Sequence, residues 1–156
     1  MTLFEQLLAM HPNERESFVD RLLALPEAPP DVPLPRGSVP YLPASVAEIL
    51  EVAKVVRSDD VFVDLGSGLG RVVMLVHMLT GARARGIEIQ EPLVRIARER
   101  ASALKLDVTF EHANVLDADL DGTVFFLYAP FNGDTLERVM GRLEHARVVW
   151  RKETID

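Results

Sequence analysis

The sequence predicts an α/β fold in which a mostly parallel sheet carries helices on both of its faces. Short apolar runs, typical of buried strands, alternate with longer segments in which apolar residues recur at helical spacing. The 156 residues, of which 48% are hydrophobic and 26% charged, have the size and composition of one globular domain. Strands that alternate with helices are joined by right-handed crossovers, so the strands run parallel and are covered on both sides.

The chain divides into three segments. Residues 1–25 are expected to form two short helices from their apolar spacing, and Asn13 and Glu16 have capping-box spacing at the start of the second. Most of the ten prolines lie in residues 26–43, which we interpret as an extended connector because proline excludes regular helices and central strands. Residues 44–156 contain the strand–helix alternation.

The elements of the third segment follow from their apolar patterns, taken in chain order. Helical spacing in 46–56 is followed by a continuous apolar run typical of a buried strand in 61–63, a core helix in 71–79 and a strand in 87–89. The second half continues with a helix in 93–104, strands in 108–110 and 124–127, a helix in 136–143 and a strand in 148–150.

The most informative motif is the glycine turn, residues 64–70, which reads Asp-Leu-Gly-Ser-Gly-Leu-Gly between a strand and a helix. Glycine lets a ligand approach the backbone, and ligands bind at the carboxyl ends of such strands. Arg71 replaces the third glycine of a dinucleotide motif, and the Asp64 carboxylate suits an ammonium group better than a pyrophosphate. Glu88, at the end of the second strand, offers two oxygens to the hydroxyls of a ribose.

These residues resemble the class I (seven-strand) S-adenosylmethionine-dependent methyltransferases, over Tyr41 to about Val149. The resemblance implies a Rossmann-like, doubly wound sheet and S-adenosylmethionine as the cofactor. It also implies that Asp64 supports the turn and the amino group and that Glu88 holds the ribose. The other cofactor-binding residues it implies are the turn residues Gly66, Ser67, Gly68 and Gly70, with Asn114 and Val115 flanking the adenine.

Two further motifs narrow the relatives. The sequence Tyr-Leu-Pro-Ala-Ser at 41–45 is similar to a segment of some protein-lysine methyltransferases, and 62–68 is close to the turn of the non-SET histone-lysine methyltransferases. Tyr-Ala-Pro-Phe at 128–131 takes the place of the Asn/Asp-Pro-Pro-Tyr/Phe motif of enzymes that methylate exocyclic amines, a departure that weakens an adenine or glutamine acceptor. The expected substrate-pocket residues are Tyr41, Tyr128, Pro130 and Phe131.

The resulting hypothesis is a methyltransferase that acts on a lysine amine of a protein, with no residue that stands out as a catalytic base. A small-molecule or RNA methyltransferase of the same fold stays open. So does a non-catalytic cofactor-binding module, which the departure at 128–131 permits. The net charge of −7 favours a basic protein as partner and disfavours nucleic acid, whose binding depends on cationic side chains.

Composition excludes several other classes. The chain has no cysteine, which excludes thiolate catalysis, zinc–thiolate sites and iron–sulfur clusters, and its four scattered histidines predict no metal site. Without a membrane span or a signal peptide, a cytoplasmic protein is expected. The resemblance implies two more strands after the fifth. We therefore expect either an incomplete sequence or a partner chain, such as a second copy, at the sheet edge, and a lid or dimer contact from the N-terminal helices.

Overall fold

The structure is a computed structural model that describes residues 1–38, 41, 43–128, 131 and 133–152. Its elements in chain order are α1 (Leu3–Ala9), α2 (Pro12–Leu23), α3 (Val46–Ala53), β1 (Val61–Leu65), α4 (Arg71–Thr80), β2 (Arg83–Glu88), α5 (Glu91–Ala103), β3 (Val108–His112), β4 (Val124–Tyr128), α6 (Gly133–Gly141) and β5 (Val148–Lys152). Every helix and strand expected from the apolar patterns is present. No helix among the described residues is long and apolar enough to cross a membrane.

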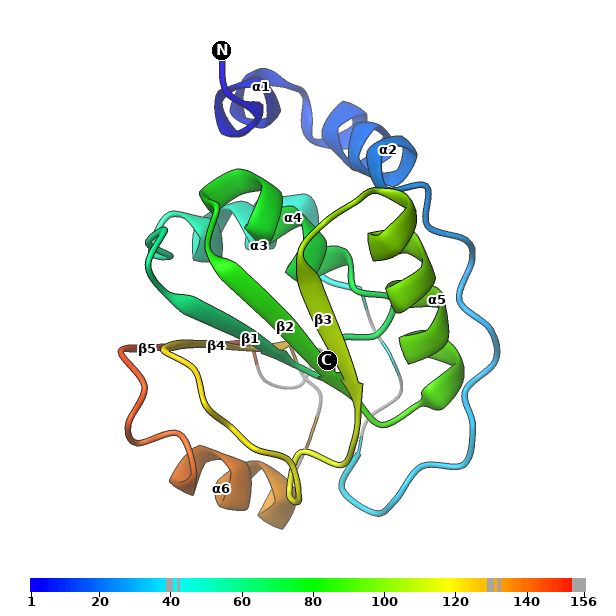
Figure 1. The fold of residues 1–156 in the computed structure, drawn as a ribbon, viewed down its shortest axis with the longest axis vertical. Helices are drawn as coiled ribbons and strands as arrows, with labels where there is room; N and C mark the ends of the chain where they lie inside the picture. Colours follow the sequence, from blue (N-terminus) through cyan, green and yellow to red (C-terminus); the bar gives the residue numbers. More distant parts are fainter. Residues whose placement is uncertain (39–40, 42, 129–130, 132, 153–156) are drawn as a thin grey trace.

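The described strands form one sheet in the order β3-β2-β1-β4-β5, and all pairs are parallel (Figure 1). β1 lies at the centre, where Asp64 is opposite Gly86 of β2 and Phe126 of β4. The chain turns to one side of β1 to form β2 and β3 and to the other side to form β4 and β5. Ligands of open parallel sheets bind where the strand order reverses, at the carboxyl ends. The expected fold class is confirmed.

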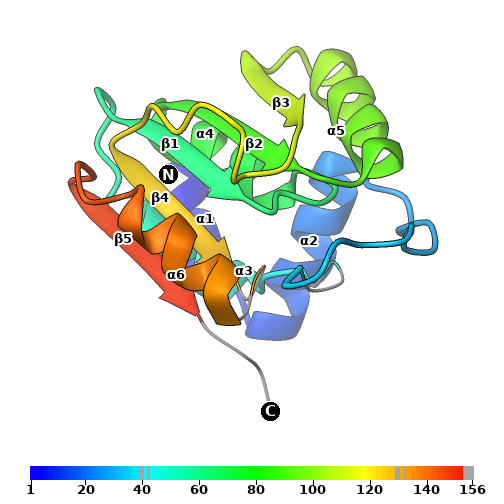
Figure 2. The same cartoon turned by 90° about the horizontal axis from the view of Figure 1, so that it is seen from below.

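Helices cover both faces of the sheet (Figures 1 and 2). The apolar residues of α3, α4 and α5 pack on one face, against side chains that include Phe62, Phe110 and Phe126. The second face carries α6, whose Val139 packs with Phe125 and with residues of the segment between β3 and β4. Successive residues of a strand point to opposite faces, which is why neighbours such as Phe125 and Phe126 belong to different cores.

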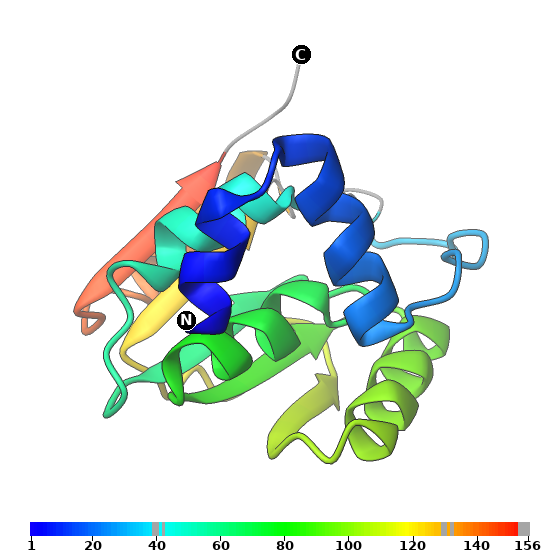
Figure 3. The ribbon, with the colours of Figure 1, turned by 90° about the horizontal axis from the view of Figure 1, so that it is seen from above.

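The N-terminal helices pack over α3 and α4 and belong to the larger core (Figure 3). Leu7, Val19 and Leu23 are completely buried there. The expected capping box of Asn13 and Glu16 is wrong, since α2 begins at Pro12 and its N-cap is His11. Proline is well suited to a first helical position because that position needs no N–H partner, and this sets the start of the helix earlier.

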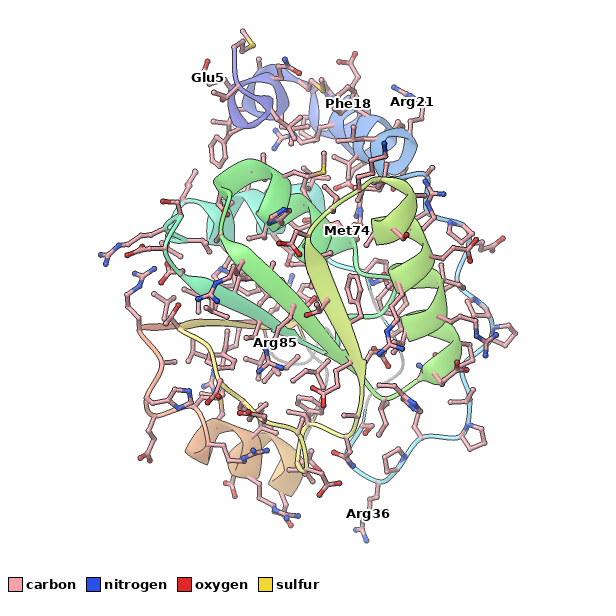
Figure 4. All side chains as sticks on the ribbon, viewed as in Figure 1. Glu5, Phe18, Arg21, Arg36, Met74 and Arg85 are labelled. Atoms are coloured by element: carbon pink, nitrogen blue, oxygen red, sulfur yellow. The ribbon has the colours of Figure 1, made fainter. Side chains whose placement is uncertain are left out.

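The proline-rich segment contains no helix or strand in residues 26–38. It runs along the outer side of α5 and bends below the sheet, where the Arg36 side chain points away from the molecule (Figure 4). Gln90 attaches it to the end of β2: its Oε1 accepts the N–H of Val32 at 3.0 Å, and its Nε2 donates to Asp31 at 2.9 Å. The segment therefore approaches the carboxyl ends of the strands, where the glycine turn lies.

Candidate functional site

The glycine turn has the backbone geometry for which its glycines are required. Gly66, Gly68 and Gly70 have φ angles of 89°, 55° and 87°, in the left-handed region that side chains disfavour. The N–H groups of Gly66 and Ser67 both donate to the carbonyl of Ile87, at 2.8 and 3.1 Å. The turn that leaves β1 is thereby closed onto the end of β2.

Glu88 is buried beside this turn, with 5% of its surface exposed. Its Oε1 accepts the N–H of Gly68 at 2.9 Å, and its Oε2 accepts the N–H of Gln90 at 2.8 Å. Burial raises the pKa of Glu88, while these backbone donors oppose the rise. A carboxylate oxygen has two acceptor positions, so each oxygen keeps one that a ribose hydroxyl can use. The predicted ribose ligand is thus also part of the scaffold of the turn.

Asp64 and Ser67 are the buried polar side chains of the glycine turn itself, and both are 3% exposed. Burial, reinforced by the charge of Glu88, raises the pKa of Asp64 well above its ordinary value. The hydroxyl oxygen of Ser67 is buried without a hydrogen-bond partner among the described residues. Buried carboxylates are stabilised by a cation and a buried hydroxyl by a polar partner, so these residues fit a ligand with a positive charge and polar groups.

Tyr41 covers the glycine turn. Its ring lies against Gly68 so closely that a Cβ there would overlap it, and its hydroxyl lies near the backbone of Leu69. Burial raises the pKa of Tyr41 to about 12. Between Tyr41, Asp64 and Tyr128 remains a cavity of about 10 Å³, enough for one water molecule at most. This cavity therefore has no room for a larger ligand while the Tyr41 ring is in this position.

The predicted substrate-pocket residues are brought together only in part. Tyr128, at the end of β4, lines the same cavity as Tyr41. Its ring stacks on Phe126, which in turn stacks on Trp150 with ring centres 4.6 Å apart. Phe131 packs instead against the core on the α6 side, and Pro130 lies outside the described residues.

Asn114 and Val115 follow β3, next to Glu88, whose carbonyl accepts the N–H of Ala113 at 3.1 Å. The side-chain oxygen of Asn114 accepts the N–H of Leu116 at 3.0 Å and so caps a turn, while its amide group keeps donors for an adenine edge. Val115 is 4% exposed and packs in the core on the α6 side. The Val115 side chain therefore contributes to the packing of this core.

Two arrangements at the site do not follow from the motifs. Arg71, the first residue of α4, is 8% exposed and binds the carbonyl of Ala44 at 2.8 Å and Glu16 of α2 at 2.5 Å. Glu48 accepts from Lys152, and it belongs to a capping box with Ser45 that its spacing in the sequence could have indicated. Among the described residues, no group of three or more histidines or acidic residues is arranged to hold a metal.

Comparison with known proteins agrees with this geometry. The sequence model of the family described as histone methylation protein DOT1 matches residues 41–121. A crystal structure of an RNA methyltransferase from Salinibacter ruber in complex with S-adenosyl-L-homocysteine has a TM-score of 0.58 and 33% identity, over 65% of this chain and 69% of that chain. A geranyl diphosphate methyltransferase in complex with GPP and sinefungin shares the fold, with a TM-score of 0.60 and 20% identity over 67% of this chain and 42% of that one.

A curated relative is similar over about half of this chain. The uncharacterized protein MJ0284 of Methanocaldococcus jannaschii is 36% identical over 73 residues, which are 47% of this chain and 33% of that protein. The match therefore spans about a third of the relative's length.

Proposed function

The chain belongs to the histone methylation protein DOT1 family, and we propose from this that it transfers the methyl group of S-adenosylmethionine to a lysine amine of a protein. The observation that carries the proposal is the glycine turn held on Glu88, with the buried carboxyl of Asp64 at its start. This arrangement suits the ribose and the positively charged amino acid of such a cofactor. Solved structures of the same fold are complexes with S-adenosyl-L-homocysteine or sinefungin.

The cofactor, when bound, supplies an electrophilic methyl group on its sulfonium. The protein's residues would position it: Glu88 through the ribose hydroxyls, Asp64 through the ammonium, and the turn glycines by close backbone approach. Tyr41 and Tyr128 would enclose the acceptor amine and exclude water. Removal from water lowers the pKa of an amine and so favours the neutral, nucleophilic form, whose proton leaves to solvent.

Calorimetry with S-adenosylhomocysteine and a labelled-methyl assay test the two parts of the proposal. The intact protein is expected to bind S-adenosylhomocysteine and to label lysine residues of core histones or another basic protein. Glu88→Gln should weaken the binding of S-adenosylhomocysteine. Glu91→Gln is the matched control and should not, because Glu91 is an acidic residue in the first turn of α5 outside the glycine turn. Absence of S-adenosylhomocysteine binding would contradict the cofactor, and binding without labelled lysine would contradict the acceptor.

RNA methylation is a second candidate, supported by the identity to the Salinibacter ruber RNA methyltransferase. The net charge of −7 argues against it, because RNA binding draws on cationic side chains. Total RNA and histones offered together in the labelling assay separate the two. We expect the labelled methyl groups to be in the protein fraction and to remain there after ribonuclease treatment.

A further inference from the structure

Lys152, the last residue of β5, is bound at the edge of the cavity described above. Its Nζ lies 3.1 Å from the Glu48 carboxylate and 5.5 Å from the centre of the Tyr128 ring. The Tyr128 hydroxyl interacts with both of these charged groups. A carboxylate combined with an aromatic face is the arrangement that proteins use to bind ammonium groups.

Glu48 is held in place independently of Lys152. Its Oε1 accepts the N–H and the hydroxyl of Ser45, at 3.1 and 2.7 Å, in the capping box of α3. The other oxygen, Oε2, is the one that binds Lys152. The carboxylate therefore presents a fixed acceptor toward the Tyr128 ring whether or not the lysine is present.

Lys152 is the replaceable member of this group. Its side chain is 46% exposed, whereas that of Glu48 is 18% exposed. An ion pair with one exposed partner is weak. Lys152 should therefore lower the apparent affinity of a competing ammonium by only about two- to five-fold. Tyr128, in contrast, also lines the cavity shared with Tyr41 and Asp64, so the ammonium position adjoins the proposed methyl-donor site.

We propose that Glu48 and Tyr128 form the subsite that receives the acceptor's ammonium group, and that Lys152 occupies it as an internal mimic until the acceptor replaces it. The proposal rests on the proposed function, because it assigns a subsite for the amine that is methylated. Glu48 acts as a specificity residue, since a neutral acceptor would leave its carboxylate uncompensated. The bound ammonium gives its proton to water before methyl transfer, so the carboxylate binds the protonated form and the transfer uses the neutral one.

A first experiment needs no acceptor protein. Trp150, the single tryptophan, stacks on Phe126 beside Tyr128, so its fluorescence reports on the subsite. n-Butylammonium chloride is titrated into the full chain, with n-butanol as the neutral control. Lys152→Met is expected to respond at a two- to five-fold lower butylammonium concentration than the unmodified protein, and Lys152→Met combined with Glu48→Gln should not distinguish butylammonium from butanol.

Matched variants separate the subsite from general surface charge. Lys54→Met removes an exposed lysine at the other end of α3, and Glu51→Gln removes an exposed carboxylate from the same helix. Both should behave as the unmodified protein. An equal response with and without Lys152, a response retained in the double variant, or no response in any variant would each overturn the assignment.

A second experiment distinguishes this proposal from the proposed function. In the histone-labelling assay, Lys152→Met should lower the KM for the acceptor and Glu48→Gln should raise it, while the affinity for S-adenosylhomocysteine stays the same in both. If the unmodified protein does not bind S-adenosylhomocysteine, the proposed methyltransferase function is refuted. The butylammonium experiment then decides the subsite by itself. An acceptor KM that neither variant changes would overturn the subsite alone.

Discussion

The backbone N–H of Gly68 donates to the Glu88 carboxylate at 2.9 Å, which attaches the middle of the glycine turn to the end of the neighbouring strand. The second oxygen of Glu88 accepts the N–H of Gln90 at 2.8 Å. One buried side chain therefore fixes the turn after β1 and the chain direction after β2. Cofactor binding and local stability are linked through this residue.

Two substitutions of Glu88 separate these contributions. Glu88→Ala leaves two buried N–H groups without acceptors and should lower the free energy of unfolding by about 2–4 kcal/mol, measured in urea. Glu88→Gln keeps one acceptor oxygen and should lose about half as much. Both should weaken S-adenosylhomocysteine binding at least tenfold by calorimetry. Full affinity in Glu88→Gln would show that its charge has no part in binding.

Asp64 is expected to reduce stability at neutral pH. Burial, and then the charge of Glu88, raise the pKa of Asp64 in the folded protein. A carboxyl with a raised folded pKa contributes most stability below its unfolded pKa, near 3.9, and loses it as the pH rises toward the folded value. Asp64→Asn removes this titration, so the variant should be more stable than the unmodified protein at pH 7.

The measurement is the free energy of unfolding between pH 4 and pH 8. The decrease with pH should be smaller in Asp64→Asn than in the unmodified protein, and its affinity for S-adenosylhomocysteine should fall because the ammonium loses its carboxylate. Asp107→Asn, which changes an exposed aspartate, should leave both curves unchanged. An identical pH dependence in Asp64→Asn would mean that Asp64 does not ionise in this range.

The strands were predictable where apolar residues form continuous runs, as in β1 and β4. β2 begins at Arg83, earlier than the strand predicted at 87–89. The prediction missed this start because Arg83 and Arg85 interrupt the apolar pattern. In the structure the Arg85 guanidinium donates to the carbonyls of Asp119 and Asp121, both at 2.8 Å, and Figure 4 shows its side chain beside the sheet. A charged residue in a strand is compensated by loop carbonyls that no local pattern reveals.

The candidate site was predictable where the backbone itself requires a residue type. Positive φ angles at Gly66, Gly68 and Gly70 require glycine, so the turn can be recognised from its spacing. The position of the Tyr41 ring over Gly68 and the bond between Glu16 and Arg71 depend on how distant segments pack. Such contacts leave no periodic pattern in the sequence.

Gly68 and Gly81 offer a comparison between strain and contact. Both have positive φ, 55° and 74°, but a Cβ at Gly81 meets nothing within 4 Å, whereas one at Gly68 overlaps Tyr41. Gly81→Ala should cost about 1–2 kcal/mol of unfolding free energy from the left-handed backbone alone. Gly68→Ala should cost more and abolish S-adenosylhomocysteine binding, whereas Gly81→Ala keeps it. Equal stability losses with binding intact in both would contradict the close contact.

Tyr41 should control access to the site. Its ring lies over Gly68, and the cavity it leaves beside the turn has room for no ligand larger than water. Tyr41→Phe removes the hydroxyl that lies near the Leu69 backbone, so the ring should move more easily and S-adenosylhomocysteine should associate faster, by at most about five-fold. Stopped-flow fluorescence of Trp150 measures the rate, and Tyr41→Trp, with a larger ring, should slow it. Association rates that are the same in all three proteins would rule out this gate.

The N-terminal helices are coupled to the glycine turn through Glu16 and Arg71. Arg71 begins α4 directly after the turn, and Glu16 binds both its guanidinium, at 2.5 Å, and the N–H of Val46, at 2.6 Å. Glu16→Ala leaves the buried guanidinium with less compensation and should lower the unfolding free energy by about 1–3 kcal/mol, less than for a fully buried pair because the Glu16 side chain is 36% exposed. Binding of S-adenosylhomocysteine should weaken too, because the start of α4 forms one wall of the cavity.

The control for this prediction is Glu14→Ala, on the exposed side of α2, which should change the unfolding free energy by less than about 0.5 kcal/mol. If Glu16→Ala matched Glu14→Ala in stability and binding, α2 would be a separate appendage and not a support of the turn.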